Sequence, residues 1–177
     1  MCSEMKNIFI TGATGFLGGE LLVDLSKGSD VGKIYCLVRS DSDKNAIKRL
    51  KKVFDFHNDV FDNEKIIPIL GDLAQGNLIE CLVENNTLKD VNYIVHSAAN
   101  TSFSPIYDKM VEDINIKGLE KNLKWSTTLN KLEIFVYVGT ATICGKQIKN
   151  RIVKEEESPN LNAEHLVKYT TQKCVER

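Results

Sequence analysis

Short apolar runs rich in β-branched residues recur along the chain and predict the strands of a buried sheet. Continuous apolar runs of this length are typical of strands that are covered on both faces. Pro68, inside the third run, weakens that prediction or places the strand near an edge of the sheet, because proline has no N–H to donate. The predicted strands are Lys6–Thr11, Lys33–Val38, Lys65–Leu70, Val91–His96 and Leu132–Val138.

The segments between these runs carry the spacing of amphipathic helices. Apolar residues recur three and four positions apart, which gives each helix one apolar face. Strands that alternate with helices favour parallel pairing through right-handed crossovers, so we expect an α/β fold with a doubly wound, mostly parallel sheet. Strand count alone also fits other layered α/β folds. The predicted faces are Phe16, Leu17, Leu21, Leu22 and Leu25; Ala46, Leu50, Val53 and Phe54; and Val111, Ile114, Gly118, Leu119 and Leu123.

The C-terminal part departs from the complete form of such a fold. A polar loop, Gly145 to Pro159, follows the fifth predicted strand and leads into one more predicted helix, Asn162 to Arg177. A doubly wound dinucleotide-binding fold normally has six strands. Because the sixth is missing, we expect residues 1–177 to be a single Rossmann-type domain, truncated before the substrate-binding part of a longer enzyme.

Composition and charge narrow the class of protein. With 42% hydrophobic and 27% charged residues and a net charge of -1, the chain looks globular and gives no reason to expect a nucleic-acid partner. It has no apolar run near the ~20 residues of a membrane span and no room for a signal peptide. The five cysteines form no CxxC pair and the three histidines show no ligand spacing. These features predict a cytoplasmic protein with free thiols and no metal site.

The first predicted strand runs into a glycine turn, TGATGFLG, with glycines at positions 12, 15 and 18. Gly12 lets the backbone leave the strand, Gly15 lets a pyrophosphate approach the main chain, and Gly18 lets the following helix pack tightly. The start of that helix presents free N–H groups and a positive dipole end to phosphates. The turn therefore predicts a dinucleotide site that includes Gly12, Thr14, Gly15, Phe16, Leu17 and Gly18.

The end of the second predicted strand indicates which dinucleotide binds. An NAD site usually has a carboxylate there for the ribose 2′-hydroxyl, whereas this strand ends in Val38-Arg39-Ser40. Arg39 is suited to a 2′-phosphate, and Arg49, one helix further on, is suited to add to that contact. Two alternatives stay open: Arg39 is a solvated strand-end residue, or Asp41 faces the ribose. We favour NADP(H).

Several of these segments together resemble a known family. TGATGFLG, CLVR before Ser40, Gly71-Asp72-Leu73 and HSAA at 96–99 look like the extended short-chain dehydrogenase/reductases. FITGATGFLG, LVR, GDL and HSAANTSF are most similar to the thioester reductase branch. That branch includes fatty acyl-CoA reductases of the male sterility type and the terminal reductase domains of carboxylic acid reductases and nonribosomal peptide synthetases.

The resemblance assigns further cofactor contacts. It implies that Asp72 and Leu73 flank the adenine, with the Asp72 carboxylate accepting from the adenine amino group. It also implies that Ala98 and Ala99 line the cofactor cleft at the end of the fourth strand. The residues by themselves indicate only a turn and a helix cap at Gly71-Asp72.

A catalytic group is indicated near the C-terminus, where Tyr169 and Lys173 form a YxxxK sequence. Residues four apart share one helix face, and a nearby ammonium lowers the pKa of a phenol. The same spacing is common by chance on lysine-rich helices. The resemblance places the catalytic hydroxyl at Thr140, with Gly139 and Cys144 departing from the usual neighbours, and implies that Asn115 supports Lys173. A polar residue on a helix face explains Asn115 almost as well.

The resemblance implies an NADPH-dependent reductase that transfers hydride to an acyl thioester. The thioester would be carried by CoA or by a phosphopantetheine carrier protein, and the product would be an aldehyde or an alcohol. Alternatives are another extended short-chain dehydrogenase, such as a ketone reductase or sugar-nucleotide epimerase or dehydratase, and a non-catalytic NADP(H)-binding module. We expect residues 1–177 alone to turn over slowly or not at all. The open edge of the fifth strand would invite a homo-oligomer or another covering partner.

Overall fold

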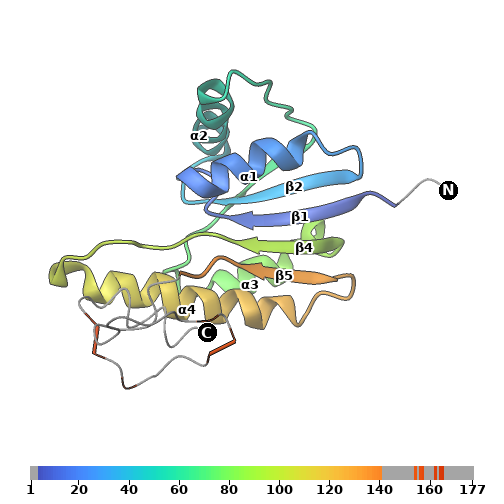
Figure 1. Ribbon diagram of the computed structural model, residues 1–177. Helices are drawn as coiled ribbons and strands as arrows, with labels where there is room; N and C mark the ends of the chain where they lie inside the picture. Colours follow the sequence, from blue (N-terminus) through green and yellow to red (C-terminus); the bar gives the residue numbers. More distant parts are fainter. Residues whose placement is uncertain (1–3, 141–153, 155, 158–161, 163, 166–177) are drawn as a thin grey trace.

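The computed structural model describes residues 4–140, together with 154, 156–157, 162 and 164–165. Its strands form one parallel sheet in the order β3-β2-β1-β4-β5, which is the order of the first five strands of a doubly wound arrangement (Figure 1). The predicted fold class is thereby confirmed. The strands are β1 (Lys6–Thr11), β2 (Val31–Val38), β3 (Ile66–Leu70), β4 (Val91–His96) and β5 (Ile134–Tyr137). The helices are α1 (Phe16–Ser26), α2 (Asp43–Phe56), α3 (Leu78–Glu84) and α4 (Asp108–Ser126), with short 3-10 turns at Asn86–Leu88 and Pro105–Tyr107.

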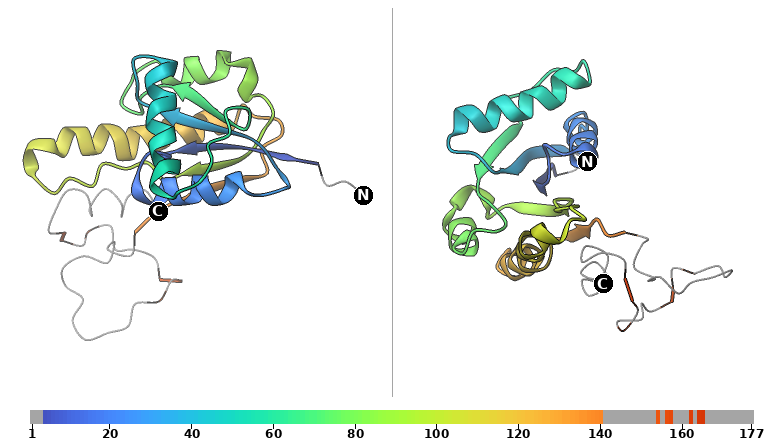
Figure 2. Two further views of the ribbon diagram at one scale, coloured as in Figure 1. Left: turned by 90° about the horizontal axis from the view of Figure 1, so that it is seen from above. Right: turned by 90° about the vertical axis from the view of Figure 1, so that its left-hand side faces the viewer.

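Helices cover both faces of the sheet, α1 and α2 on one side and α3 and α4 on the other (Figures 1 and 2). Successive residues of a strand point to opposite faces, so β1 sends Ile8 and Ile10 into the α1–α2 core and Phe9 into the α3–α4 core. The Phe9 ring lies 4.6 Å from that of Trp125 on α4, centroid to centroid. Because both faces are buried, the strands read as continuous apolar runs rather than as alternating ones.

The position of Pro68 confirms the prediction that its strand lies at an edge of the sheet. Pro68 pairs in register with Cys36, and its strand β3 forms an edge of the sheet, where a missing N–H donor is tolerated. Burial raises the pKa of the neighbouring Cys36 thiol, which keeps this free cysteine unreactive. Cys81 is free and exposed, and the other cysteines lie outside the described residues.

The predicted apolar face of the first helix is partly wrong. Phe16 is 88% exposed and Leu17 is 46% exposed, whereas Gly18, Gly19, Leu22 and Val23 are buried. Because α1 begins at Phe16, directly after the turn that follows β1, its first two residues lie at the cleft and are exposed among the described residues. On α4 the last predicted position is also wrong, since Leu123 is 44% exposed.

The sequence pattern did not predict α3. Only two of its residues, Leu78 and Leu82, are buried, and a helix this short gives no repeated period. At the other edge of the sheet, β5 pairs only with β4 among the described residues, and Ile134 and Val136 are 52% and 44% exposed. The partner expected to cover this edge stays a prediction. Within the described residues, no helix combines the length and apolarity of a membrane span, and no three metal-ligating side chains cluster together.

Candidate functional site

A cleft of about 510 Å³ lies at the carboxyl ends of the strands, where the strand order reverses between β1 and β4. We call it the switch-point cleft, since ligands of doubly wound folds bind at this topological position. The described residues predicted to contact the dinucleotide all line it: Gly12, Thr14, Gly15, Phe16, Leu17, Gly18, Arg39, Arg49, Asp72, Leu73, Ala98 and Ala99. The sequence reasoning missed Thr11, Leu37, Gly71, Ser97, Thr101 and Ile114, which line it too.

The floor of the cleft is the turn between β1 and α1, and it has no room for side chains at two of its glycines. Gly12 has a φ of +79°, and a Cβ there would lie 2.7 Å from the backbone nitrogen of Ala98. A Cβ at Gly18 would overlap the Gly12 carbonyl and lie 2.7 Å from the Ser97 Oγ. Gly18 thus packs tightly against the turn at Gly12 and against Ser97, which follows β4.

The N-terminus of α1, the positive end of its helix dipole, faces the same turn and has no side-chain cap. Gly15 is the N-cap and offers no side chain to the first-turn N–H groups, and that turn holds no acidic residue. These N–H groups have no acceptor within the helix, and the helix dipole favours a negative charge beside them. The turn and the helix start together form a cradle suited to a pyrophosphate.

Hydrogen bonds tie the ends of β1 and β4 together beneath this cradle. The Ser97 hydroxyl donates to the Thr11 carbonyl at 2.7 Å, and the Ala98 N–H donates to the Thr11 Oγ1 at 3.3 Å. The Thr11 Oγ1 also lies 3.0 Å from the Nδ1 of buried His96. Thr11 and Ser97 therefore fix the two strand ends between which a ligand would lie.

Asn115 of α4 holds the loop that follows β4. Its side chain is 1% exposed; its Oδ1 accepts from the Asn100 N–H at 2.8 Å, and its Nδ2 donates to the Asn100 carbonyl at 3.0 Å. This loop carries Ala99 and Thr101 into the cleft. Asn115 is thus more than a polar residue on a helix surface. Its predicted support of Lys173 lies outside the described residues.

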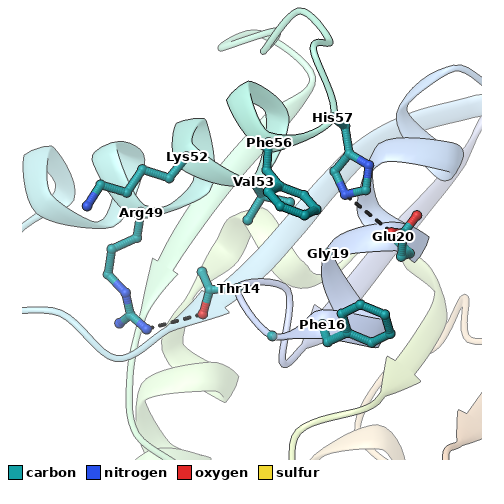
Figure 3. Close-up of a pocket in the computed structure, with 10 residues that line it drawn as sticks. Thr14, Phe16, Gly19, Glu20, Arg49, Lys52, Val53, Phe56 and His57 are labelled. Atoms are coloured by element: carbon teal, nitrogen blue, oxygen red, sulfur yellow. Dashed lines mark hydrogen bonds and ion pairs between the residues drawn. The ribbon is translucent and has the colours of Figure 1, made fainter.

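The side of the cleft at the end of β2, where the adenosine is predicted, is built from exposed side chains. Arg39 is 70% exposed, and its Nη1 lies 4.0 Å from the Asp72 Oδ2. Arg49 donates from Nη2 to the Thr14 Oγ1 at 3.1 Å (Figure 3). Its Nη1 also donates to the Arg39 carbonyl. Arg49 therefore already links the glycine turn to the end of β2, while the Arg39 guanidinium remains at the rim.

Asp41, the alternative ribose contact, points away from the cleft. Its Oδ1 accepts from the Asn45 Nδ2 at 2.7 Å and from the Ser42 hydroxyl at 3.1 Å, so it serves the start of α2. These hydrogen bonds lower the pKa of the Asp41 carboxyl. The end of β2 thus presents a cation rather than a carboxylate to the cleft.

The Gly71-Asp72-Leu73 segment is fixed from two sides. The Asp72 Oδ1 accepts from the Ala74 N–H at 3.0 Å, which confirms the turn, whereas the N-cap of α3 is Asn77 rather than Asp72. Lys121 of α4 donates to the Leu73 carbonyl at 2.9 Å. Lys121 gave no signal in the sequence, because nothing there placed α4 beside this turn.

The predicted catalytic residues are only partly described. Thr140 follows β5 and is half-buried, at the carboxyl end of the sheet. Tyr169 and Lys173 lie outside the described residues, so their placement and that of the predicted helix stay predictions.

Comparisons with known proteins identify the family of the chain. The profile of the male sterility protein family, an NAD-binding family, matches residues 10–175. Fatty acyl-CoA reductase 2, chloroplastic, of Arabidopsis thaliana is 32% identical over 85% of the chain, which spans 26% of that protein. The isonitrile lipopeptide synthase of Mycobacterium tuberculosis is 32% identical over 79% of the chain, or 6% of its own length.

Solved structures show the same likeness. The terminal reductase domain of the myxalamid biosynthetic pathway superposes with a TM-score of 0.82 at 26% identity, over 99% of this chain and 44% of that one. A thiolation-reductase di-domain of an archaeal non-ribosomal peptide synthetase gives a TM-score of 0.74 at 27% identity, over 97% and 46%. The chain thus spans less than half the length of these relatives. By its matched residues, the chain belongs to the male sterility protein family, an NAD-binding family.

Proposed function

We propose that this chain binds NADPH and forms the cofactor-binding part of a reductase that transfers hydride to an acyl thioester. The thioester is carried by CoA or by a phosphopantetheine arm, and the product is an aldehyde that can be reduced further to an alcohol. One observation carries the proposal: a glycine turn without room for side chains, an uncapped helix start and an exposed arginine border the same switch-point cleft. The named relatives, fatty acyl-CoA reductases and reductase domains of peptide synthetases, support the substrate class.

The shape of the cleft supports a specific arrangement of the dinucleotide. The pyrophosphate would lie on the Gly12–Gly18 turn, with the adenosine toward Asp72 and Leu73 and the nicotinamide toward Ala98 and Ala99. Arg39 would hold a 2′-phosphate, because its guanidinium stands at the rim and Asp41, the alternative ribose contact, is turned away. These contacts favour NADPH over NADH.

The chemistry would be shared between the cofactor and side chains at the end of the sheet. Bound cofactor supplies the hydride that such a reduction requires. Tyr169 would donate a proton to the carbonyl oxygen, and Thr140 would hold the same oxygen by a hydrogen bond as negative charge develops on it. Lys173 would bind the nicotinamide ribose and lower the pKa of Tyr169, with Asn115 in support. Overall, one hydride and one proton convert a thioester into an aldehyde and a free thiol.

Two measurements test the proposal. Titration with NADPH and with NADH, followed by nucleotide fluorescence, should show NADPH binding at least about tenfold more tightly, or ~1.4 kcal/mol. Absence of binding by either nucleotide would remove the proposal, and equal binding would remove the NADPH preference. NADPH consumption should then be compared between an acyl-CoA and a UDP-sugar, using a polypeptide that continues past residue 177. Conversion of the UDP-sugar without net NADPH consumption, and no turnover of the acyl-CoA, would indicate an epimerase- or dehydratase-type enzyme instead.

A further inference from the structure

A second depression, which we call the helix groove, lies between α1 and α2 beside the switch-point cleft (Figure 3). It has a volume of about 410 Å³ and opens between Phe16 and Gly19 of α1 and Lys52 and Phe56 of α2. Thr14 and Phe16 line both spaces, so the groove adjoins the cleft directly. The proposed hydride transfer makes no use of Lys52 or Phe56.

The groove exposes two aromatic rings. Phe16 and Phe56 are 88% and 77% exposed, more than any other aromatic side chain in the described part of the chain. Figure 3 shows Arg49 and Lys52 toward one end of the groove and the two rings toward the other, where Glu20 pairs with His57 at 3.6 Å. Exposed apolar surface rimmed by polar groups is typical of an interaction site.

The exposed side of α2, whose Arg49 and Lys52 line the groove, carries a concentrated positive charge. The exposed cations of α2 lie within two and a half turns, and its acids, Asp43 and Asp55, stand near the two ends. None of its lysines forms an ion pair with a carboxylate in the described residues, although the whole chain has a net charge of -1. The cations are Lys44, Lys48, Arg49, Lys51 and Lys52.

The length and the position of this row of cations on α2 indicate what kind of partner binds there. From Lys44 to Lys52 the row extends for roughly 12 Å along the helix, which is longer than the phosphates of one nucleotide require. A membrane pressed flat against Phe16 would obstruct the adjoining cleft. A folded partner with an acidic surface and one or two apolar side chains avoids both difficulties.

We propose that the helix groove is the docking surface for an acidic carrier domain that bears the thioester. Carboxylates of the carrier face the cations of α2, and its apolar side chains pack against Phe16 and Phe56. This inference rests on the proposed function, since a carrier that delivers a thioester must dock beside the cleft that binds the cofactor. Charge complementarity of this kind governs encounter and register more than it governs total affinity.

Binding of a carrier domain provides the test. The probe is the thiolation domain of the archaeal thiolation-reductase protein, expressed alone with its phosphopantetheine arm and titrated into the NADPH-bound chain by calorimetry. We expect binding that weakens with added salt and falls at least about tenfold in the double variant Lys48→Glu, Lys52→Glu. Phe56→Ala should weaken it about fivefold without altering the charge. The control, Lys89→Glu with Lys124→Glu, changes the same number of lysines on the α3–α4 side and should bind like the parent.

Each outcome has one meaning for the docking surface. All variants should bind NADPH equally, which shows that they are folded. Carrier binding that is absent, or that both double variants weaken alike, overturns the proposal. Binding of CoA or of anionic phospholipid vesicles at the groove, with no carrier binding, overturns it in favour of those ligands. Reduction of a carrier-free N-acetylcysteamine thioester tests the proposed function separately, because that substrate needs no docking surface.

Discussion

The first β–α turn and the end of β2 border the same cleft but are constructed in different ways. At the turn, the ligand-facing groups are backbone N–H groups, and Gly12 and Gly18 are packed so closely that a single Cβ would collide with neighbouring main chain. At the end of β2, the groups are long side chains, and Arg39 is 70% exposed. Under the proposed function, the turn would decide whether a dinucleotide binds at all, whereas the rim would decide which dinucleotide binds.

Gly18→Ala should have the largest effect. The new Cβ would overlap the Gly12 carbonyl, so the turn must shift. We expect the free energy of unfolding to fall by about 3 kcal/mol and nucleotide binding to be lost, measured by urea denaturation and NADPH titration. Gly76→Ala is the matched control, because a Cβ there meets nothing within 4 Å. Unchanged NADPH binding by the Gly18 variant would show that the turn is not the phosphate site.

Arg39→Ala should separate the two nucleotides. Loss of a charge-assisted contact to the 2′-phosphate should weaken NADPH by about 2 kcal/mol, or roughly 30-fold, and leave NADH within about twofold. The exposed position predicts little change in unfolding. Lys44→Ala removes an exposed cation that does not line the cleft and serves as the control. If both nucleotides weaken equally, Arg39 does not contact the 2′-phosphate.

Arg49→Ala should weaken both nucleotides to the same extent. Its guanidinium already donates to the Thr14 hydroxyl and the Arg39 carbonyl, so its removal loosens the turn and the rim together. We expect a loss of about 1 kcal/mol, or roughly fivefold, in each titration. Thr14→Val removes one of these hydrogen bonds from the other side and should give a smaller common loss. A loss confined to NADPH would make Arg49 a direct phosphate ligand, as the sequence suggested.

Asp72→Asn should have the smallest effect. The amide oxygen can still accept from the Ala74 N–H and from an adenine amino group, while the charge opposite Arg39 is lost. An exposed pair at 4.0 Å contributes little, so the dissociation constant for NADPH should change by less than about twofold. A tenfold loss in the same titration would indicate that the carboxylate itself contacts the adenosine.

The sequence predicted the sheet well because its signals are local. Each strand is a compact apolar run between turn residues, and the expected bounds differ from the observed ones by at most two residues, as at Val31 and Ile134. The short helix α3 was not predicted, because Leu78 and Leu82 are its only buried residues. Phe16 and Leu17 were misplaced because periodicity identifies apolar side chains but not which of them lie exposed at the cleft.

The same limit applies to the cleft. The glycine turn and Arg39 were identifiable because each carries its chemistry in a short segment. The contacts of Thr11 with Ser97, and of Lys121 with Leu73, join residues far apart in the sequence, and only the observed packing brings them together. The roles of Tyr169 and Lys173 still rest on spacing and resemblance.

The pairing of Asn115 with Asn100 has a consequence for reading natural variation. The carbonyl oxygen and the amino group of the Asn115 side-chain amide both bond one backbone residue, Asn100, so aspartate loses a donor and glutamine is a carbon too long. Judged by its burial alone, Asn115 resembles a residue that only fills the protein interior. Yet a missense change there would release the segment after β4, and the defect would emerge as poor coenzyme retention in a protein that still folds.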